Sequence, residues 1–231
     1  MTTIKKTFLC AFMSLCLVLI ASPLWGTSKA DDEQTIRNAT AVLQAMVANN
    51  NAPASVLKRA DCLIILPSVK KFAVGIGGTG GRGPMICRTG KDFSGKWGPP
   101  AMFSIGGASA GFQIGGTASD YIIAVMSPAA VSRVLNAKVK IGSDISAAAG
   151  PGASAGTSMS SADMLTYGRS SGLFAGVSLD GASLSPDSNA NRRLYGRSFA
   201  AADIVAGETV KPTSAGQSLV DLLNAKGGKH E

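Results

Sequence analysis

Histidine is almost absent from the sequence. The single histidine, His230, is second from the end of a glycine-rich tail, where a preorganised catalytic base is poorly supported. One histidine and a pair of cysteines also supply no recognisable set of metal ligands, and the aspartates are scattered rather than grouped. We therefore expect no catalytic residue, no bound metal and no cofactor.

Aromatic and charged residues are scarce as well, at 6% and 16% of the 231 residues, whereas 45% are hydrophobic and 28 are glycine. This composition is typical of one globular domain with short appendages. The net charge of +8 would suit a nucleic acid, but the few aromatic residues and the export predicted below argue against that partner.

The N-terminus has the pattern of a secretory signal. Lys5 and Lys6 precede an apolar run at residues 8–21, and residues 28–30 (Ser-Lys-Ala) place small residues where signal peptidase requires them. One alternative is an uncleaved anchor, but fourteen residues fall short of the roughly 20 that span a bilayer. The other is a lipoprotein signal at Cys10 or Cys16, but each follows a leucine where lipoprotein processing needs a small residue. We expect residues 1–30 to be a signal peptide for Sec export to the periplasm or cell envelope. Its removal would leave a net charge of +5, because three lysines and no acid are lost.

Cys62 and Cys87 are the only cysteines beyond that segment. In an oxidising compartment, two cysteines in strand-like runs favour a disulfide over a metal site. The bond would stabilise the fold by about 3 to 4 kcal/mol in the chain-entropy model. The alternative is a pair of buried, reduced thiols.

Helical patterns flank the domain. Residues 31–50 begin with three acids and then place apolar residues at helical spacing. Only Arg37 is basic there, so docking on the protein's own core is favoured over a membrane-surface helix. Ser127 and Pro128 are typical of a helix start, which predicts a mid-chain helix. Closing helices are predicted at residues 199–206 and 214–225, followed by a flexible tail at 226–231.

Between these helices, from about residue 60 to 198, short apolar or alternating segments are separated by glycines, which is typical of antiparallel β structure. The Ala, Gly and Ser residues of 147–161 indicate a connection. We therefore expect an α+β fold: a glycine-rich antiparallel β core, either a sheet or a partly closed barrel, with the N-terminal, mid-chain and C-terminal helices packed on it.

The densest glycine stretch, VGIGGTGGRG at residues 74–83, contains a G-x-G-x-x-G match at Gly75, Gly77 and Gly80. A dinucleotide site needs a helix after the glycines and an acid about 20 residues further on, and this sequence provides neither. We therefore expect no nucleotide ligand. The stretch instead predicts a strand that enters a tight glycine corner and returns toward Cys87, with Arg82 at the tip.

Two serines, Ser109 and Ser154, lie in G-x-S-x-G matches. A nucleophile elbow requires a strand, a sharp turn and then a helix. Ser109 is followed by a strand-like segment and Ser154 lies in the small-residue connection, so composition explains both matches.

Positive charge gathers in one part of the chain. Within forty residues there are only two acids, Asp61 and Asp92, against Lys58, Arg59, Lys70, Lys71, Arg82, Arg88, Lys91 and Lys96. Trp97 follows Lys96 in a loop rich in Gly and Pro. A basic surface with an exposed indole would suit an anionic bilayer, at about 1 kcal/mol per cation near the surface. The alternative is a solvated face with Trp97 folded over the core.

Six further blocks occur in order along the chain: LPSVKK (66–71), GGTGGRG (77–83), CRT (87–89), GFQIGG (111–116), GLFAGVSLDG (172–181) and YG (195–196). With these blocks, residues 31–225 resemble the SYLF lipid-binding domain family. The resemblance implies a non-enzymatic domain that binds phospholipids, with phosphoinositides preferred by eukaryotic members, some of which also bind and bundle actin. It also implies a glycine-rich antiparallel β core with helices packed on it.

Together these observations predict an exported, non-enzymatic protein that recognises anionic phospholipid headgroups at a membrane surface. The expected lipid-binding residues are Lys70, Lys71, Arg82, Arg88 and Lys96, with Trp97 at the interface. The alternative is a cell-envelope module that binds another protein through a sheet edge or the Trp97 loop.

Overall fold

The computed structural model describes residues 27–48, 54–74, 76–110, 115–150, 161–170 and 173–226. Its helices are α2 (Lys29–Ala48), α3 (Ala54–Arg59), α4 (Pro128–Asn136), α5 (Ser188–Tyr195), α6 (Ala201–Ala206) and α7 (Ser214–Lys226), with a short 3₁₀ turn at Lys91–Phe93. Its strands are β1 (Cys62–Val74), β2 (Ile76–Cys87), β3 (Ala101–Ala110), β4 (Gly115–Val125), β5 (Val139–Lys140), β6 (Ala147–Ala149), β7 (Met164–Ser170), β8 (Leu173–Gly176) and β9 (Ser183–Pro186).

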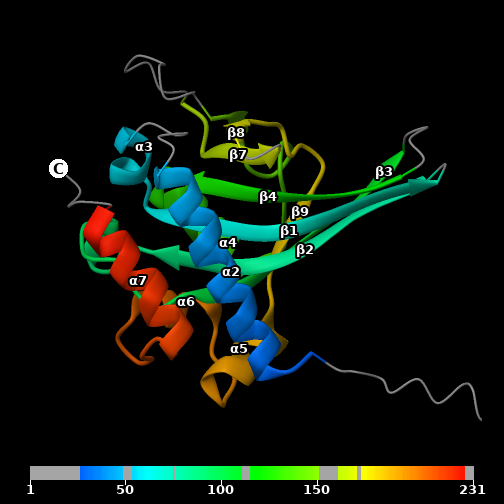
Figure 1. Cartoon of the computed structure of the whole chain (residues 1–231). Coiled ribbons are helices and arrows are strands. Elements are labelled where there is room, and N and C mark those ends of the chain that lie inside the picture. Colours follow the sequence, from blue (N-terminus) through cyan, green and yellow to red (C-terminus); the bar gives the residue numbers. More distant parts are fainter. Residues whose placement is uncertain are drawn as a thin grey trace, which may run out of the picture.

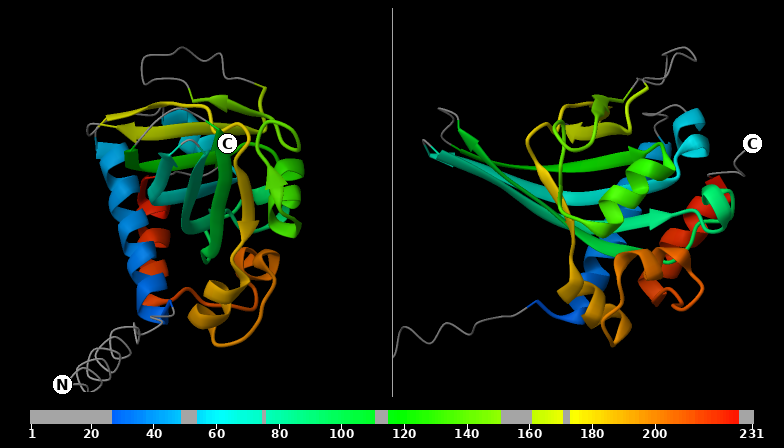
Figure 2. Two further views of the ribbon diagram at one scale, coloured as in Figure 1. Left: turned by 90° about the vertical axis from the view of Figure 1, so that its right-hand side faces the viewer. Right: turned by 180° about the vertical axis from the view of Figure 1, so that it is seen from behind.

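The strands form one strongly curled sheet in the order β5-β9-β3-β2-β1-β4-β7-β6, with β8 also paired to β7 (Figures 1 and 2). Every described strand pair is antiparallel except β6 with β7. The predicted α+β class and glycine-rich β core are therefore confirmed. The predicted connection at 147–161 begins with β6, and its residues 151–160 lie outside the described part of the chain.

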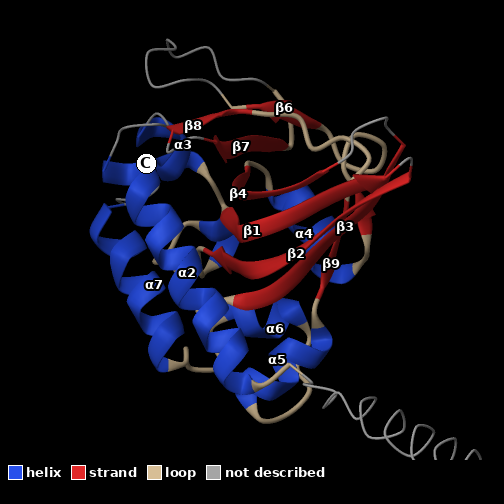
Figure 3. Ribbon diagram, turned by 45° about the vertical axis from the view of Figure 1, so that its right-hand side comes forward, coloured by secondary structure: helices blue, strands red, loops and turns tan. Residues whose placement is uncertain are grey.

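Successive side chains of a strand point to opposite faces of the sheet, and a different set of helices covers each face. Leu63 and Ile65 of β1 pack with residues of α2, α5 and α7, whereas Ile64 and Leu66 pack with residues of α4 and α6. Figure 3 shows α2 and α7 side by side over one face. The side chains of residues 63–66 are all wholly buried, so the centre of the sheet lies between two apolar layers.

Helix α2 packs on the core through one apolar stripe, as the sequence predicts. Ile36, Leu43 and Met46 are buried, and its N-terminus is capped by Ser28, whose hydroxyl accepts from the Asp31 amide at 3.2 Å. The predicted signal-peptide boundary at residue 30 falls in the first turn of this helix, and cleavage there stays a prediction. None of the described helices is both long and apolar enough to cross a membrane. Residues 1–26 of the predicted leader lie outside the described residues.

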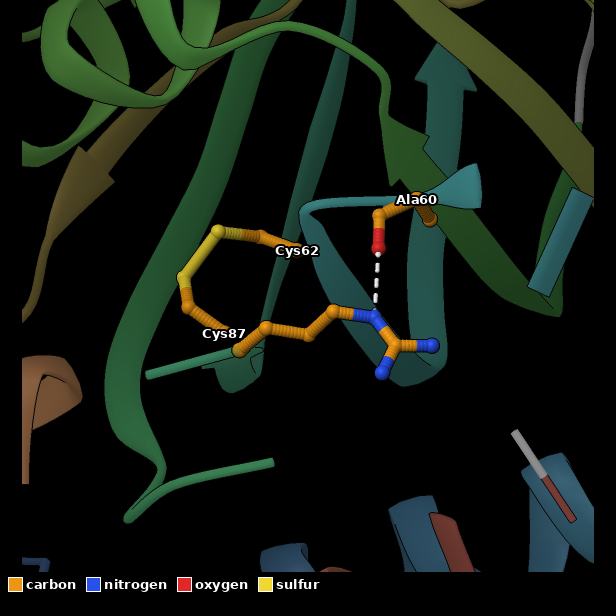
Figure 4. The surroundings of a disulfide bond; sticks show 4 residues. Ala60, Cys62 and Cys87 are labelled. Carbon is orange, nitrogen blue, oxygen red and sulfur yellow. Dashed lines mark hydrogen bonds between the residues drawn. A yellow bond between two sulfur atoms is a disulfide. The ribbon is translucent and has the colours of Figure 1, made fainter. Parts of the chain in front are cut away.

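Cys62 and Cys87 face each other across β1 and β2 and form the predicted disulfide (Figure 4). Both residues are wholly buried among apolar side chains. The disulfide therefore joins the two central strands of the sheet at the end away from their shared corner.

Val74 and Ile76 pair with each other, so the chain turns back between the end of β1 and the start of β2. The prediction of a tight glycine corner is confirmed by its flanking residues, because Gly75 itself is outside the described residues. Placing Arg82 at the tip was wrong: Arg82 pairs with Ser104 in the middle of β2. The glycine run continues as a strand because β1 and β3 pair with it on both sides, so the chain turns between Val74 and Ile76, well before Arg82.

Near this corner β1 to β4 extend away from the helices as a blade (Figure 1). We call this part the arm and define it by the positions paired with Lys70 and beyond, which are residues 70–74 of β1, 76–80 of β2, 106–110 of β3 and 115–118 of β4.

A candidate anion-binding groove beside helix α2

An open groove of about 480 Å³ lies where α2 passes over β1 and β2. Its polar lining includes Thr35 and Asn38 from α2, Ser68 and Lys70 from β1, Arg82 from β2 and Ser104 from β3. Hydroxyl, amide, ammonium and guanidinium groups are all hydrogen-bond donors. The lining is therefore suited to a phosphate or another oxyanion.

The groove exists because β1 is irregular at Pro67 and Ser68. Pairing with β4 shifts register between Leu66 and Val69, and Ser68 has a left-handed φ of 52°. Its amide, which is turned out of the regular ladder, donates to Asp120 Oδ1 at 2.9 Å. On the opposing strand a side chain at Gly80 would meet nothing within 4 Å. A bulge on one strand and a missing side chain on the next leave the space open.

Arg82 is held in the groove by a buried carboxylate. Its guanidinium lies 2.8 Å from Asp32 Oδ1, and Asp32 is wholly buried at the start of α2. Arg193 of α5 donates to both oxygens of the same carboxylate, at 2.6 and 3.1 Å. This hydrogen bonding raises the pKa of Arg193 above its ordinary value. Asp32 thus joins three elements, and the Arg82 side chain stays 27% exposed to the groove.

The cations of the groove are largely balanced by nearby acids. Lys70 is exposed at its rim, whereas Arg82 and Arg193 share Asp32, and the charges of Asp187 and Asp31 also act on Arg193. Asp187 also lines the groove, but its carboxylate accepts from the Ala190 amide at 2.9 Å and caps α5. The exposed cations are therefore the strongest groups available to an anionic ligand.

Lys71 lies on the other face of the sheet. It is exposed, and its ammonium lies 5.3 Å from the centre of the Tyr121 ring, which belongs to the core packed under α4 and α6. Lys70 and Lys71 therefore present one cation on each side of the sheet at the base of the arm.

Arg88 and Trp97 are inside the protein, 2% and 3% exposed, at the opposite end of β2. The Arg88 guanidinium stacks 4.6 Å from the indole centre and donates to the Ala60 and Leu57 carbonyls. Figure 4 draws the hydrogen bond to the Ala60 carbonyl. Burial lowers the pKa of Arg88, and the charge of Asp61 opposes that effect. The sequence left Trp97 either exposed at a membrane or folded over the core, and the structure shows the second. The Arg88 guanidinium and the part of the core beneath α7 enclose the indole.

Lys96 is exposed beside Trp97. Of the six residues predicted to bind lipid, the structure brings Lys70 and Arg82 together in the groove, places Lys71 behind them and separates Arg88, Lys96 and Trp97 from all three. Asp32 was not predicted from the sequence as part of the site. Its only signal was an acid in the first turn of a helix, which a helix dipole explains equally well.

The enzyme-like and nucleotide-like motifs do not have the geometry they would need. Ser109 pairs with Gly77 inside the β3–β2 ladder instead of ending a strand before a helix. Gly77 and Gly80 are themselves within a strand. Ser154 and His230 lie outside the described residues. Within the described ranges, no three His, Cys, Asp or Glu side chains gather as a metal site.

Comparison with known proteins identifies relatives along most of the chain. Residues 106–226 match the family described as Ysc84, Las17-binding protein actin regulator. The chain is 35% identical over 190 residues to an SH3 domain-containing protein of Schizosaccharomyces pombe, across 79% of this chain and 43% of that protein. It is 34% identical over 187 residues to human SH3 domain-containing YSC84-like protein 1, across 78% and 52%.

Protein YSC84 of Saccharomyces cerevisiae is 33% identical over 191 residues, across 79% of this chain and 40% of that protein. The chain thus spans about half the length of these relatives or less, and none of the three names denotes an enzyme. The family match covers more than half of the chain, from the end of β3 through β4 to the closing helices, and each of these three relatives aligns with more than three quarters of the chain. The chain therefore belongs to the Ysc84 family, which is the SYLF family that its ordered sequence blocks resemble.

Proposed function

We propose that this protein is a non-enzymatic module that binds anionic phospholipid headgroups through Lys70, Lys71 and Arg82. The observation that carries the proposal is the placement of Lys70 and Lys71 on opposite faces of one projecting sheet, with Lys70 and Arg82 sharing an open, donor-lined groove. Arg88, Lys96 and Trp97 are left out of this site because they lie at the other end of β2.

The expected strength is modest. Each Lys or Arg near an anionic surface contributes about 1 kcal/mol, so the three cations would contribute about 3 kcal/mol. Asp32 offsets part of the Arg82 charge. The attraction would weaken as salt rises, because the exposed cations are screened.

We further propose that the protein works outside the cytoplasm. The signal-like N-terminus supports export, and a disulfide between the central strands is typical of proteins in oxidising compartments. Anionic headgroups of the cell envelope would then be the ligands.

Co-sedimentation with vesicles tests the proposal. Vesicles of phosphatidylglycerol and phosphatidylcholine should retain the protein, and vesicles of phosphatidylcholine alone should not. Lys70→Glu with Lys71→Glu should weaken partitioning about 30-fold or more, the equivalent of two lost cations. Lys138→Glu with Lys211→Glu is the matched control, because both lysines are exposed elsewhere and the net charge changes equally. Equal losses in the two variants, or no preference for anionic vesicles, would sink the proposal.

The second candidate is a protein-binding module. It is favoured by the family description, which names a protein partner, and by Leu173, an exposed large apolar residue in β8 at the margin of the sheet. Leu173→Ser should then abolish capture of a defined envelope protein from lipid-free extract, and Lys70→Glu with Lys71→Glu should leave that capture unchanged. Capture that requires vesicles would favour the lipid function instead.

A further inference from the structure

We propose that the end of the arm enters the interfacial layer of a phospholipid bilayer while Lys70 and Lys71 hold phosphates on its two sides. This inference rests on the proposed lipid function and adds a mode of binding to it. It makes the arm a shallow insertion element rather than a surface that only approaches the membrane.

The strand register places four strand ends together. Val74 pairs with Ile76 across the corner, Ile76 pairs with Ala110 of β3, and Ala73 pairs with Gly115 of β4. In Figure 1 and in the right-hand view of Figure 2, the described helices lie over the opposite part of the sheet, and this end projects clear of them. The arm can therefore meet a flat surface without the body of the protein intervening.

The arm's end is free of charge. Residues 72–81 and 97–119 contain no Asp, Glu, Lys or Arg, and the corner segment carries Phe72, Val74 and Ile76 among glycines. Charge begins at Lys71, the residue before Phe72. In a bilayer, the charged phosphates lie outside the apolar acyl chains. An uncharged, apolar strand end bordered by lysines matches that arrangement.

The distances fit that order. With a rise of about 3.3 Å per residue, Val74 lies roughly 10 Å beyond Lys71 along the strand. Interfacial elements bury their apolar parts by about 5 to 10 Å, and lysines extend toward phosphates from that depth. Lys70 borders the groove on one face and Lys71 lies over Tyr121 on the other, so an inserted arm would meet phosphates on both sides.

Backbone pairing limits the depth. At the arm, β1 and β2 are the inner strands and are paired on both sides. The outer partners end earlier: β9 pairs with β3 only up to Gly106, and β7 pairs with β4 only from Asp120. The described ends of β3 and β4 thus keep an unpaired edge, which hydrocarbon does not tolerate and the hydrated interface does. The arm is suited to shallow insertion and not to spanning.

Depth can be measured with an introduced fluorophore. Ile76→Trp in a Trp25→Phe background leaves Trp97, which is 3% exposed, as the second indole and an internal reference. The protein is recovered from the producing cell, and its N-terminus is determined by mass spectrometry so that all variants are compared in one form. On phosphatidylglycerol–phosphatidylcholine vesicles, the new indole should shift to the blue and be quenched more by shallow than by deep brominated acyl chains.

Protein that sediments with these vesicles without any quenching would overturn insertion while leaving the proposed function intact. Protein that fails to sediment would overturn both. Quenching that is strongest with deep bromines would also contradict the shallow placement.

Salt separates the apolar contact from the charged one. Ile76→Ser should weaken partitioning about tenfold at both 0.1 M and 0.5 M salt, because apolar burial is not screened. Ile76→Leu should bind like the unsubstituted protein, and the loss from Lys70→Glu with Lys71→Glu should shrink at high salt. Equal binding of the Ser and Leu variants would overturn the inference. If Ile76→Ser does not fold, Val74→Ser serves the same comparison.

Discussion

Asp32 Oδ1 lies 2.8 Å from a guanidinium nitrogen of Arg82, and the aspartate is wholly buried. This contact joins the first turn of α2 to the central strand β2, and Arg193 extends it to α5. The groove is therefore bounded by a helix whose N-terminus is fixed by an ionic cluster. Groove shape and helix docking should depend on the same carboxylate.

Asp32→Ala should lower the free energy of unfolding by about 2 to 3 kcal/mol, because it leaves two arginines without their buried partner. This loss is at or below the usual figure of about 3 to 5 kcal/mol for breaking a buried pair, since both arginine side chains are 27% exposed. Urea unfolding would measure the change. Glu33→Ala is the control: Glu33 makes a 3.7 Å surface pair with Arg37, worth under about 0.5 kcal/mol. Similar losses in the two variants would contradict this account of Asp32.

The glycines of β2 are predicted to differ sharply in what they tolerate. A Cβ at Gly83 would lie 1.9 Å from the Ile65 carbonyl oxygen, whereas one at Gly80 would meet nothing within 4 Å. Gly83→Ala should therefore cost about 3 kcal/mol or more, because backbone atoms must move apart, and Gly80→Ala should stay within about 0.5 kcal/mol. Thermal and urea unfolding of the two variants would decide, and equal effects would refute the close approach.

Local signals in the sequence were sufficient for much of the fold. Ser127 accepts from the Ala130 amide at 3.2 Å, as its position before Pro128 predicted. The apolar stripe of α2 faces the core, and the two cysteines in strand-like runs are bonded. Each of these features depends on residues near one another in the chain or on one chemically specific pair.

Other features depend on long-range pairing and were not predictable in this way. Helix α5 went unpredicted although Asp187 caps it and Gly196 ends it in a left-handed conformation. Its eight residues give too short an apolar pattern to stand out. Arg82 was misplaced because the corner position depends on how far β3 accompanies β2. The burial of Arg88 depends on carbonyls of residues about thirty positions earlier.

The disulfide is predicted to carry a substantial part of the stability. It links residues 25 positions apart, and removing it should lower the free energy of unfolding by about 3 kcal/mol in the chain-entropy model. Cys62→Ala with Cys87→Ala, compared with the oxidised protein by urea unfolding, tests this. Because both sulfurs are buried, native protein should also resist a thiol reductant that acts quickly in urea. Rapid reduction without denaturant would contradict this burial.

Substitutions at Trp97 test whether its indole belongs to the protein interior or contacts the membrane. Its indole nitrogen has no hydrogen-bond partner among the described residues, so Trp97→Phe loses no hydrogen bond and keeps a ring under Arg88. We expect that variant to lose about 1 kcal/mol of stability and Trp97→Ala to lose about 3 to 5 kcal/mol, because the alanine leaves a cavity.

In a Trp25→Phe background, Trp97 emission should stay unchanged when anionic vesicles are added, and Trp97→Phe should sediment with them normally. A blue shift on vesicle binding, or loss of binding in a folded Trp97→Phe variant, would instead place the indole at the membrane and return Lys96 and Arg88 to the binding surface.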